Sequence, residues 1–131
     1  MISVRREGSE MGVFVSIRGW LECDERQLAA VRQVIADHSD EHYSGGWGFP
    51  NRHFNWTYYV FYGGDVRESA VDWFMEQLRS MAAIPASDED GDRVLGFFVA
   101  SSEVAPQVER QVRGGSVTTR QTDHRLDYLA D

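Results

Sequence analysis

Three aspartates at alternate positions form the pattern in this sequence that comes nearest to a metal-binding motif. Asp88, Asp90 and Asp92 have the spacing of the first ligands of a calcium-binding loop, in which carboxylate oxygens hold the ion. The rest of that motif is missing. Arg93 stands at the sixth position, where the loop requires glycine, and Val99 stands at the twelfth, where a bidentate glutamate is needed. We therefore expect no metal here and interpret the stretch as a solvated loop that offers an anionic patch to a cationic partner.

Two histidines present a second candidate metal site. His38 and His42 are four residues apart at the end of an expected helix, so they could share a face and bind a metal. A third ligand would have to come from Asp37, Glu41 or His53. We favour the interpretation of two partly exposed side chains at a helix end, and we interpret His53 as a turn residue rather than a catalytic base.

A nucleophilic or acid–base site is not predicted either. Cys23 precedes an expected helix, whose dipole could lower the pKa of the thiol, but the carboxylates of Glu22, Asp24 and Glu25 raise that pKa again. No pair of carboxylates lies in an apolar setting that would separate their pKa values, and no glycine-rich phosphate loop is present. We expect a structural cysteine, no cofactor and no catalysis.

Charge and length narrow the class of protein further. The chain has 131 residues and a formal net charge of -8, and all 13 of its cationic Lys or Arg residues are arginine. This balance argues against binding nucleic acid and favours a basic protein partner. The single cysteine, the lack of a secretory signal and the lack of an apolar run of roughly 20 residues predict a cytoplasmic protein that does not enter a membrane.

Hydrophobic periodicity predicts the elements of the first half of the chain. Residues 12–22 alternate as a half-buried strand does, and Asp24 with Gln27 forms the capping box of a helix that fades near Glu41. Residues 47–50 are expected to form a short edge strand. The aromatic segment 56–62 is expected to form a full strand that Gly63 and Gly64 terminate.

The second half continues this order. Asp65 and Glu68 have the spacing of another helix cap, and residues 94–100 are apolar enough for a buried strand. A hairpin over residues 104–121 should turn at Gly114 and Gly115. We predict one α+β domain over residues 1–131, with loosely ordered ends at 1–11 and 123–131. It should be a mostly antiparallel sheet of about five strands with two helices on one face, in the order β-α-β-β-α-β plus a C-terminal hairpin.

The layout of these elements resembles the seventh numbered family of immunity proteins from bacterial polymorphic-toxin systems. The similar pieces are the strand that ends in Gly19–Leu21 before a capped acidic helix, the aromatic strand Trp56–Gly63 with the helix segment Val71–Phe74, and the strand Leu95–Glu103 before a last hairpin. They cover roughly Gly12 to Gln121. The resemblance implies a protein that binds and neutralises a cognate toxin without catalysis.

Together, the charge and the resemblance predict an acidic contact surface for a basic toxin such as a nuclease. The residues that we expect to form it are acidic, with one tryptophan as an anchor: Asp37, Asp40, Glu41, Asp88, Glu89, Asp90, Asp92 and Trp47. The alternative is a small-molecule-binding or regulatory module whose aromatic strand lines an apolar pocket. An enzyme that uses His53 with a carboxylate, and a plain structural subunit, are further possibilities.

Overall fold

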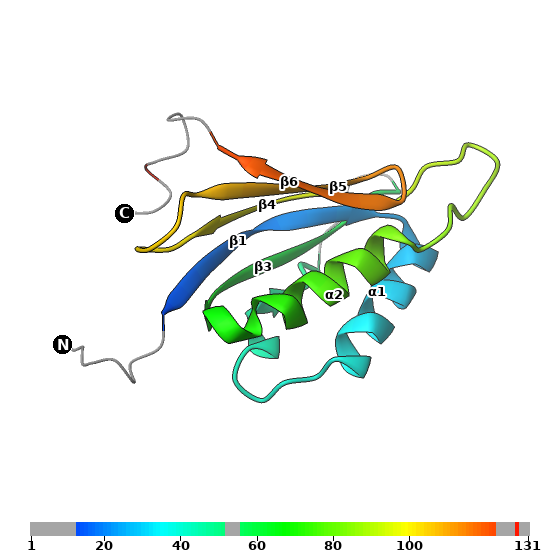
Figure 1. The fold of residues 1–131 in the computed structure, drawn as a ribbon. Coiled ribbons are helices and arrows are strands. Elements are labelled where there is room, and N and C mark those ends of the chain that lie inside the picture. The colour runs from blue at the N-terminus through cyan, green and yellow to red at the C-terminus, as the bar shows by residue number, and fades with distance from the viewer. Residues whose placement is uncertain (1–12, 52–55, 123–127, 129–131) are drawn as a thin grey trace.

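A six-stranded antiparallel sheet carries two helices on one of its faces (Figure 1). The computed structural model describes residues 13–51, 56–122 and 128. In spatial order the strands are β2 (Trp47–Gly48), β3 (Tyr58–Arg67), β1 (Phe14–Cys23), β4 (Leu95–Ser101), β5 (Val108–Arg113) and β6 (Ser116–Gln121). The helices are α1 (Glu25–Asp37) and α2 (Val71–Ala82), and short 3-10 turns occupy Ser44–Gly46 and Glu68–Ala70. The predicted α+β class and order of elements are confirmed, with six strands where about five were expected. The predicted loose ends lie largely outside the described residues.

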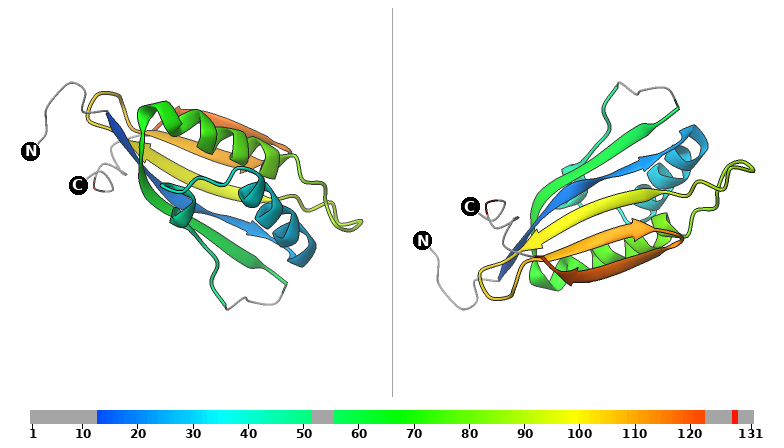
Figure 2. Two further views of the ribbon diagram at one scale, coloured as in Figure 1. Left: turned by 90° about the horizontal axis from the view of Figure 1, so that it is seen from below. Right: turned by 90° about the horizontal axis from the view of Figure 1, so that it is seen from above.

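Strand β1 lies at the centre of the sheet and pairs with β3 on one side and β4 on the other (Figure 2). Its residues alternate as the sequence predicts. Val15, Ile17 and Leu21 are buried on the helix-covered face, whereas Phe14 and Trp20 are exposed on the other face. This alternation fixes the register, because a slip by one residue would turn every apolar side chain to the wrong face.

The first helix begins as predicted. The Asp24 side chain accepts a hydrogen bond from the Gln27 backbone N–H at 2.8 Å, and the Gln27 side chain accepts one from the Asp24 N–H at 2.9 Å. This reciprocal capping box satisfies two of the N–H groups that a helix leaves without partners at its start. Helix α1 then ends at Asp37, four residues before the predicted fade.

An aromatic cluster fills the space between the helices and the sheet. Trp47 stacks on Phe74 of α2, with ring centroids 5.5 Å apart, and meets Tyr62 and Phe98 edge-on. Tyr62 also donates its hydroxyl hydrogen to the Tyr43 carbonyl at 2.8 Å. Trp47 is only 7% exposed. Our prediction that Trp47 anchors a partner at the surface is therefore wrong, since its indole packs in the core.

The second helix begins later than the sequence predicts. Gly63 and Gly64 do not end strand β3, because they pair with Arg18 and Ile17 of β1, and β3 continues to Arg67. Asp65 consequently lies inside the strand, and α2 starts at Val71 without a side-chain cap. The length of the central strand decides this, since each residue of β1 has a partner on β3.

The last two strands form the predicted hairpin. Arg113 pairs with Ser116, and Gly114 and Gly115 form the two-residue turn with φ angles of 60° and 86°. Positive φ at both turn positions matches the twist of the two strands and favours glycine at each. Among the described residues, neither helix is long and apolar enough to cross a membrane.

Candidate functional site

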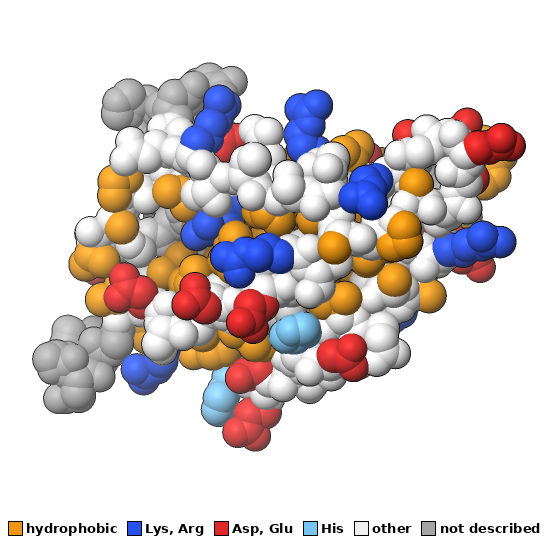
Figure 3. Space-filling view, turned by 45° about the vertical axis from the view of Figure 1, so that its right-hand side comes forward, with side chains coloured by type: hydrophobic (Ala, Val, Ile, Leu, Met, Phe, Trp, Pro, Cys, Tyr) orange, Lys and Arg blue, Asp and Glu red, His pale blue; other side chains and the backbone are white. Residues whose placement is uncertain are grey.

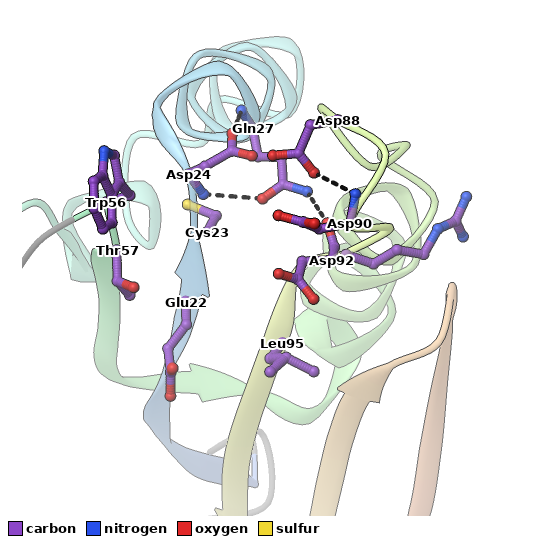
Figure 4. A pocket seen from close by; sticks show the side chains of 11 residues that line it. Glu22, Cys23, Asp24, Gln27, Trp56, Thr57, Asp88, Asp90, Asp92 and Leu95 are labelled. Carbon is purple, nitrogen blue, oxygen red and sulfur yellow. Dashed lines mark hydrogen bonds between the residues drawn. The ribbon is translucent and has the colours of Figure 1, made fainter.

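An open, acidic pocket of about 670 Å³ lies at the end of the sheet where β1 stops and β3 and β4 begin (Figure 4). Its described lining residues come from three segments of the chain: Glu22, Cys23, Asp24, Gln27, Trp56, Thr57, Asp88, Asp90, Asp92, Arg93 and Leu95. The three aspartates of the loop stand on one side, Trp56 and Thr57 stand on the other, and Cys23 and Asp24 lie between them. We call this site the acidic pocket.

The antiparallel register brings these segments together. Cys23 at the end of β1 pairs with Tyr58 at the start of β3, and Glu22 pairs with Leu95 at the start of β4. The residues just before β3 and β4 therefore meet the residues that follow β1. Trp56 and Asp92 consequently face the same space, although they are far apart in the sequence.

The loop that carries the aspartates is held by the start of helix α1. Gln27, which is 3% exposed, donates its side-chain amide to the Asp92 carbonyl at 2.9 Å. Asp24 accepts a second bond from the Ser87 hydroxyl at 2.9 Å. Within the loop, the Asp88 carboxylate accepts a hydrogen bond from the Asp90 N–H at 3.0 Å. The capping box of α1 thus also positions the acidic loop.

The pocket carries uncompensated negative charge. Within the described part of the chain, the carboxylates of Asp90 and Asp92 have no hydrogen-bond or ion-pair partner. Arg93 is the one cation among the described lining residues, but its guanidinium lies against Gly115, where a β-carbon would collide with it. Two carboxylates thus face solvent and are available to a cation from outside.

Trp56 provides a broad apolar surface beside these charges. Its side chain is 83% exposed, the highest exposure among the large apolar residues described. An adjoining pocket of about 630 Å³ shares Asp24, Asp88 and Trp56 with the acidic pocket and adds Arg26 and Glu25. The indole therefore stands between two hollows, with carboxylates in both.

The other predicted acidic group lies elsewhere. Asp37 is the last residue of α1, whereas the acidic loop contacts the first turn of that helix, which places the two groups roughly 18 Å apart along its axis. Figure 3 shows acidic side chains at the loop and, separately, beside the histidines that follow α1. The structure therefore does not unite the predicted acidic residues in one surface.

Two members of this second group have local roles. The Asp40 carboxylate accepts hydrogen bonds from the N–H groups of His42 and Tyr43 at 2.8 and 2.9 Å and so stabilises the turn after α1. Asp37 accepts a bond from Gln33 at 2.8 Å. Glu41 is exposed and lies 3.5 Å from the His42 imidazole.

Those candidate nucleophiles and metal ligands that the structure describes do not assemble into a reactive site. Burial, with a smaller contribution from Asp24, raises the pKa of Cys23 to about 12, so the thiol stays protonated. The His38 ring nitrogen Nδ1 lies 2.8 Å from the Val34 carbonyl, back along its own helix. Among the described residues, no three His, Cys, Asp or Glu side chains are placed to hold a metal ion; His53 lies outside those residues.

Most members of the acidic pocket were not predicted from the sequence as site residues, among them Glu22, Asp24 and Trp56. The signal that could have found them is strand adjacency. One strand precedes the first helix and another follows the acidic loop. If these two strands are antiparallel neighbours, the loop must lie beside residues 22–24. The sequence interpretation left the order of the strands open, and so it did not use this constraint.

Aromatic side chains continue from the pocket across the uncovered face of the sheet. Trp20 lies opposite Phe61 on β3 and Phe97 on β4, and the rings of Trp20 and Phe97 are 5.7 Å apart. The Trp20 indole N–H donates to the Glu22 carboxylate at 3.0 Å, which links this row to the pocket. Both Trp20 and Phe61 are exposed, at 36% and 47%.

Comparison of the chain with protein-family models, with curated proteins and with solved structures found no match. The resemblance to immunity proteins therefore stays a prediction.

Proposed function

We propose that the protein is a non-catalytic binding protein that recognises a basic protein through the acidic pocket. In line with the resemblance to immunity proteins, the partner is a cognate bacterial toxin, which this protein neutralises in the cytoplasm by direct binding. The observation that carries the proposal is the pair of carboxylates of Asp90 and Asp92, which have no partner among the described residues and lie across from the exposed indole of Trp56.

The chemistry of the pocket suits an arginine or lysine side chain of the partner. A carboxylate binds a guanidinium through charge-assisted hydrogen bonds, and an indole face attracts a cation and covers its apolar stem. Trp56 is exposed at the rim, so it is free to stack on such a side chain. Binding residues of this type carry a large share of the energy in many interfaces.

The aromatic row beside the pocket supports a larger contact area. Glu22 and Leu95 line both the acidic pocket and a smaller hollow of about 340 Å³ beside Trp20 and Phe97. A partner that places a cation in the pocket would reach this apolar surface directly. Apolar contacts would then supply affinity, while the carboxylates supply selectivity and a fast encounter.

The arrangement of the core gives less support to the alternative of a small-molecule module. That alternative needs the aromatic strand predicted over residues 56–62 to line an apolar cavity. Instead, Trp47 and Tyr62 pack against Phe74, with ring centroids 5.5 and 4.9 Å away. Their rings fill the space that a ligand would need.

A co-expression experiment tests the proposal. The product of the neighbouring reading frame is expressed with and without this protein, and growth rescue and co-purification are scored. We expect rescue and a stable complex whose association rate falls as salt is added, because opposite charges steer the encounter. A harmless neighbour with no complex would overturn the proposal.

A matched pair of charge reversals locates the contact. The double variant Asp90→Lys and Asp92→Lys should lose rescue and slow association. The double variant Asp37→Lys and Glu41→Lys changes the net charge equally at the far end of α1 and should retain rescue. Equal effects of the two variants would show that only the net charge matters and would place the contact outside the pocket.

A further inference from the structure

Strand β6 forms one edge of the sheet, and half of its backbone groups point away from the protein. Thr122 donates its N–H to the Gln107 carbonyl on the β5 side at 3.1 Å. In an antiparallel pair, residues alternate between those that exchange hydrogen bonds with the neighbour and those that do not. Thr122 and Ser116 both direct their backbone groups toward β5, and so do Thr118 and Arg120 between them. The backbone N–H and C=O groups of Val117, Thr119 and Gln121 therefore face outward.

This edge lacks the features that usually block strand addition. Residues Ser116–Gln121 contain no proline or lysine, and their register with β5 runs without a bulge. The one charged side chain is Arg120, whose Nε lies 2.9 Å from the Glu109 carboxylate of the neighbouring strand. Every side chain of β6 except the half-buried Val117 is exposed. Within Ser116–Gln121, therefore, no residue blocks the addition of another strand.

We propose that the occupant of this edge is a second copy of the chain, paired antiparallel about a two-fold axis at Thr119. In that register Thr119 faces Thr119 of the second copy, and Val117 faces Gln121. All outward groups of both strands are then satisfied, in about six hydrogen bonds. Arg120 lies opposite Thr118, so the two arginines do not face each other. The sheets of two molecules become continuous.

Charges on helix α2 favour the same partner. The Arg110 guanidinium donates to the Thr119 hydroxyl at 2.9 Å and interacts electrostatically with both Asp72 and Arg79 of α2. The proposed axis is perpendicular to the sheet and therefore sets the two α2 helices antiparallel. The Asp72 end of one α2 helix then lies at the same level as the Arg79 end of the other. The opposite charges of these two residues make the surfaces around the axis complementary.

This inference does not depend on the proposed function, because no residue of the acidic pocket takes part in the pairing. It is tested on the full chain by sedimentation across a dilution series. We expect a concentration-dependent dimer, and a monomer at every concentration would overturn the proposal. Thr119→Pro removes an outward N–H and no backbone bond to β5, although it loses the hydroxyl that accepts from Arg110. It should raise the dimer dissociation constant at least about tenfold relative to Thr119→Val, which loses the same hydroxyl. Thr119→Val keeps that N–H and serves as the control, which should remain dimeric.

Cysteine cross-linking tests the register and does not depend on how well the proline variant folds. Residues that exchange hydrogen bonds across an antiparallel pair have Cα atoms about 5.5 Å apart, a separation that a disulfide spans. Thr119→Cys should therefore oxidise to a covalent dimer. Thr118→Cys, which faces Arg120 of the second copy, should not. The native Cys23 is buried and gives little background. Cross-linking at Thr118 instead of Thr119, or at neither position, would contradict the proposed pairing.

Discussion

The side-chain amide of Gln27 donates a hydrogen bond to the backbone carbonyl of Asp92, 2.9 Å away. Gln27 belongs to the capping box of α1, and Asp92 lies at the end of the acidic loop. One buried side chain therefore fixes both the start of a helix and the position of the carboxylates proposed to bind a partner. A change at Gln27 should alter stability and binding together.

Gln27→Glu separates these two roles. The glutamate can still accept the hydrogen bond from the Asp24 N–H, but it loses the donor to Asp92 and places a carboxylate against that carbonyl. We expect a loss of about 3 kcal/mol in the free energy of unfolding, because a buried polar contact becomes unfavourable. Urea denaturation measures it. The same change at exposed Gln33 should cost less than about 0.5 kcal/mol, and equal losses would show that Gln27 does not tether the loop.

Trp47 and Trp56 should respond in opposite ways to replacement by alanine. Trp47→Ala leaves a cavity among Tyr62, Phe74 and Phe98, and should cost about 3–5 kcal/mol of stability. Trp56→Ala removes an exposed side chain, so stability should stay within about 0.5 kcal/mol while partner binding weakens by about 2 kcal/mol. Thermal unfolding and titration of the partner measure the two effects. A Trp56→Ala variant that binds normally would remove Trp56 from the interface.

Gly19 follows Arg18 in strand β1, and Gly63 pairs with Arg18 from strand β3. The two glycines should tolerate alanine very differently. A β-carbon at Gly19 would run into the Phe97 carbonyl and Phe98, whereas one at Gly63 meets nothing within 4 Å. Gly19→Ala should therefore cost about 1–3 kcal/mol through overpacking. Gly63→Ala should stabilise by about 0.5 kcal/mol, because a strand glycine loses more entropy on folding. Chemical denaturation of both variants decides this, and a neutral Gly19→Ala would imply a looser β1–β4 contact.

The raised pKa of Cys23 predicts a loss of stability at alkaline pH. The folded protein keeps the thiol proton up to about pH 12, whereas the unfolded chain releases it above the ordinary thiol pKa of 9.0. The unfolded state then binds fewer protons, so stability falls as pH rises through this window, by up to about 1.4 kcal/mol per pH unit. Cys23→Ala should remove this contribution. Burial also raises the pKa of Tyr62 to about 12. The difference in stability between the wild-type protein and Cys23→Ala therefore separates the effect of the thiol from that of Tyr62. Parallel stability curves for the two proteins between about pH 9 and pH 11 would contradict the prediction.

Local patterns predicted much of the fold. The alternation of residues 13–21, the capping box at Asp24 and the Gly114–Gly115 turn depend on nearby residues, and each was confirmed. Gly63 and Gly64 were misinterpreted as a strand end because their conformation is set by β1, a distant partner. Trp47 was misplaced for the same reason, since Phe74 and Phe98 decide its burial.

The site was harder to predict than the fold. Asp88, Asp90 and Asp92 were identified from their composition alone, but their association with Glu22, Asp24 and Trp56 follows from the order of the strands. Periodicity along a single sequence indicates which residues are buried and does not indicate which strands are neighbours.

The central place of β1 has a consequence for how the chain folds. The strands that pair with β1 are distant from it in the sequence: Cys23 pairs with Tyr58 of β3, and Ser16 pairs with Ser101 of β4. Among the described strands, β1 is synthesised before either of its partners and has no hairpin to join, so it stays unpaired until β3 has been made. Such distant pairings slow folding, so the nascent chain exposes the apolar residues of β1 during this interval and has most need of a chaperone then.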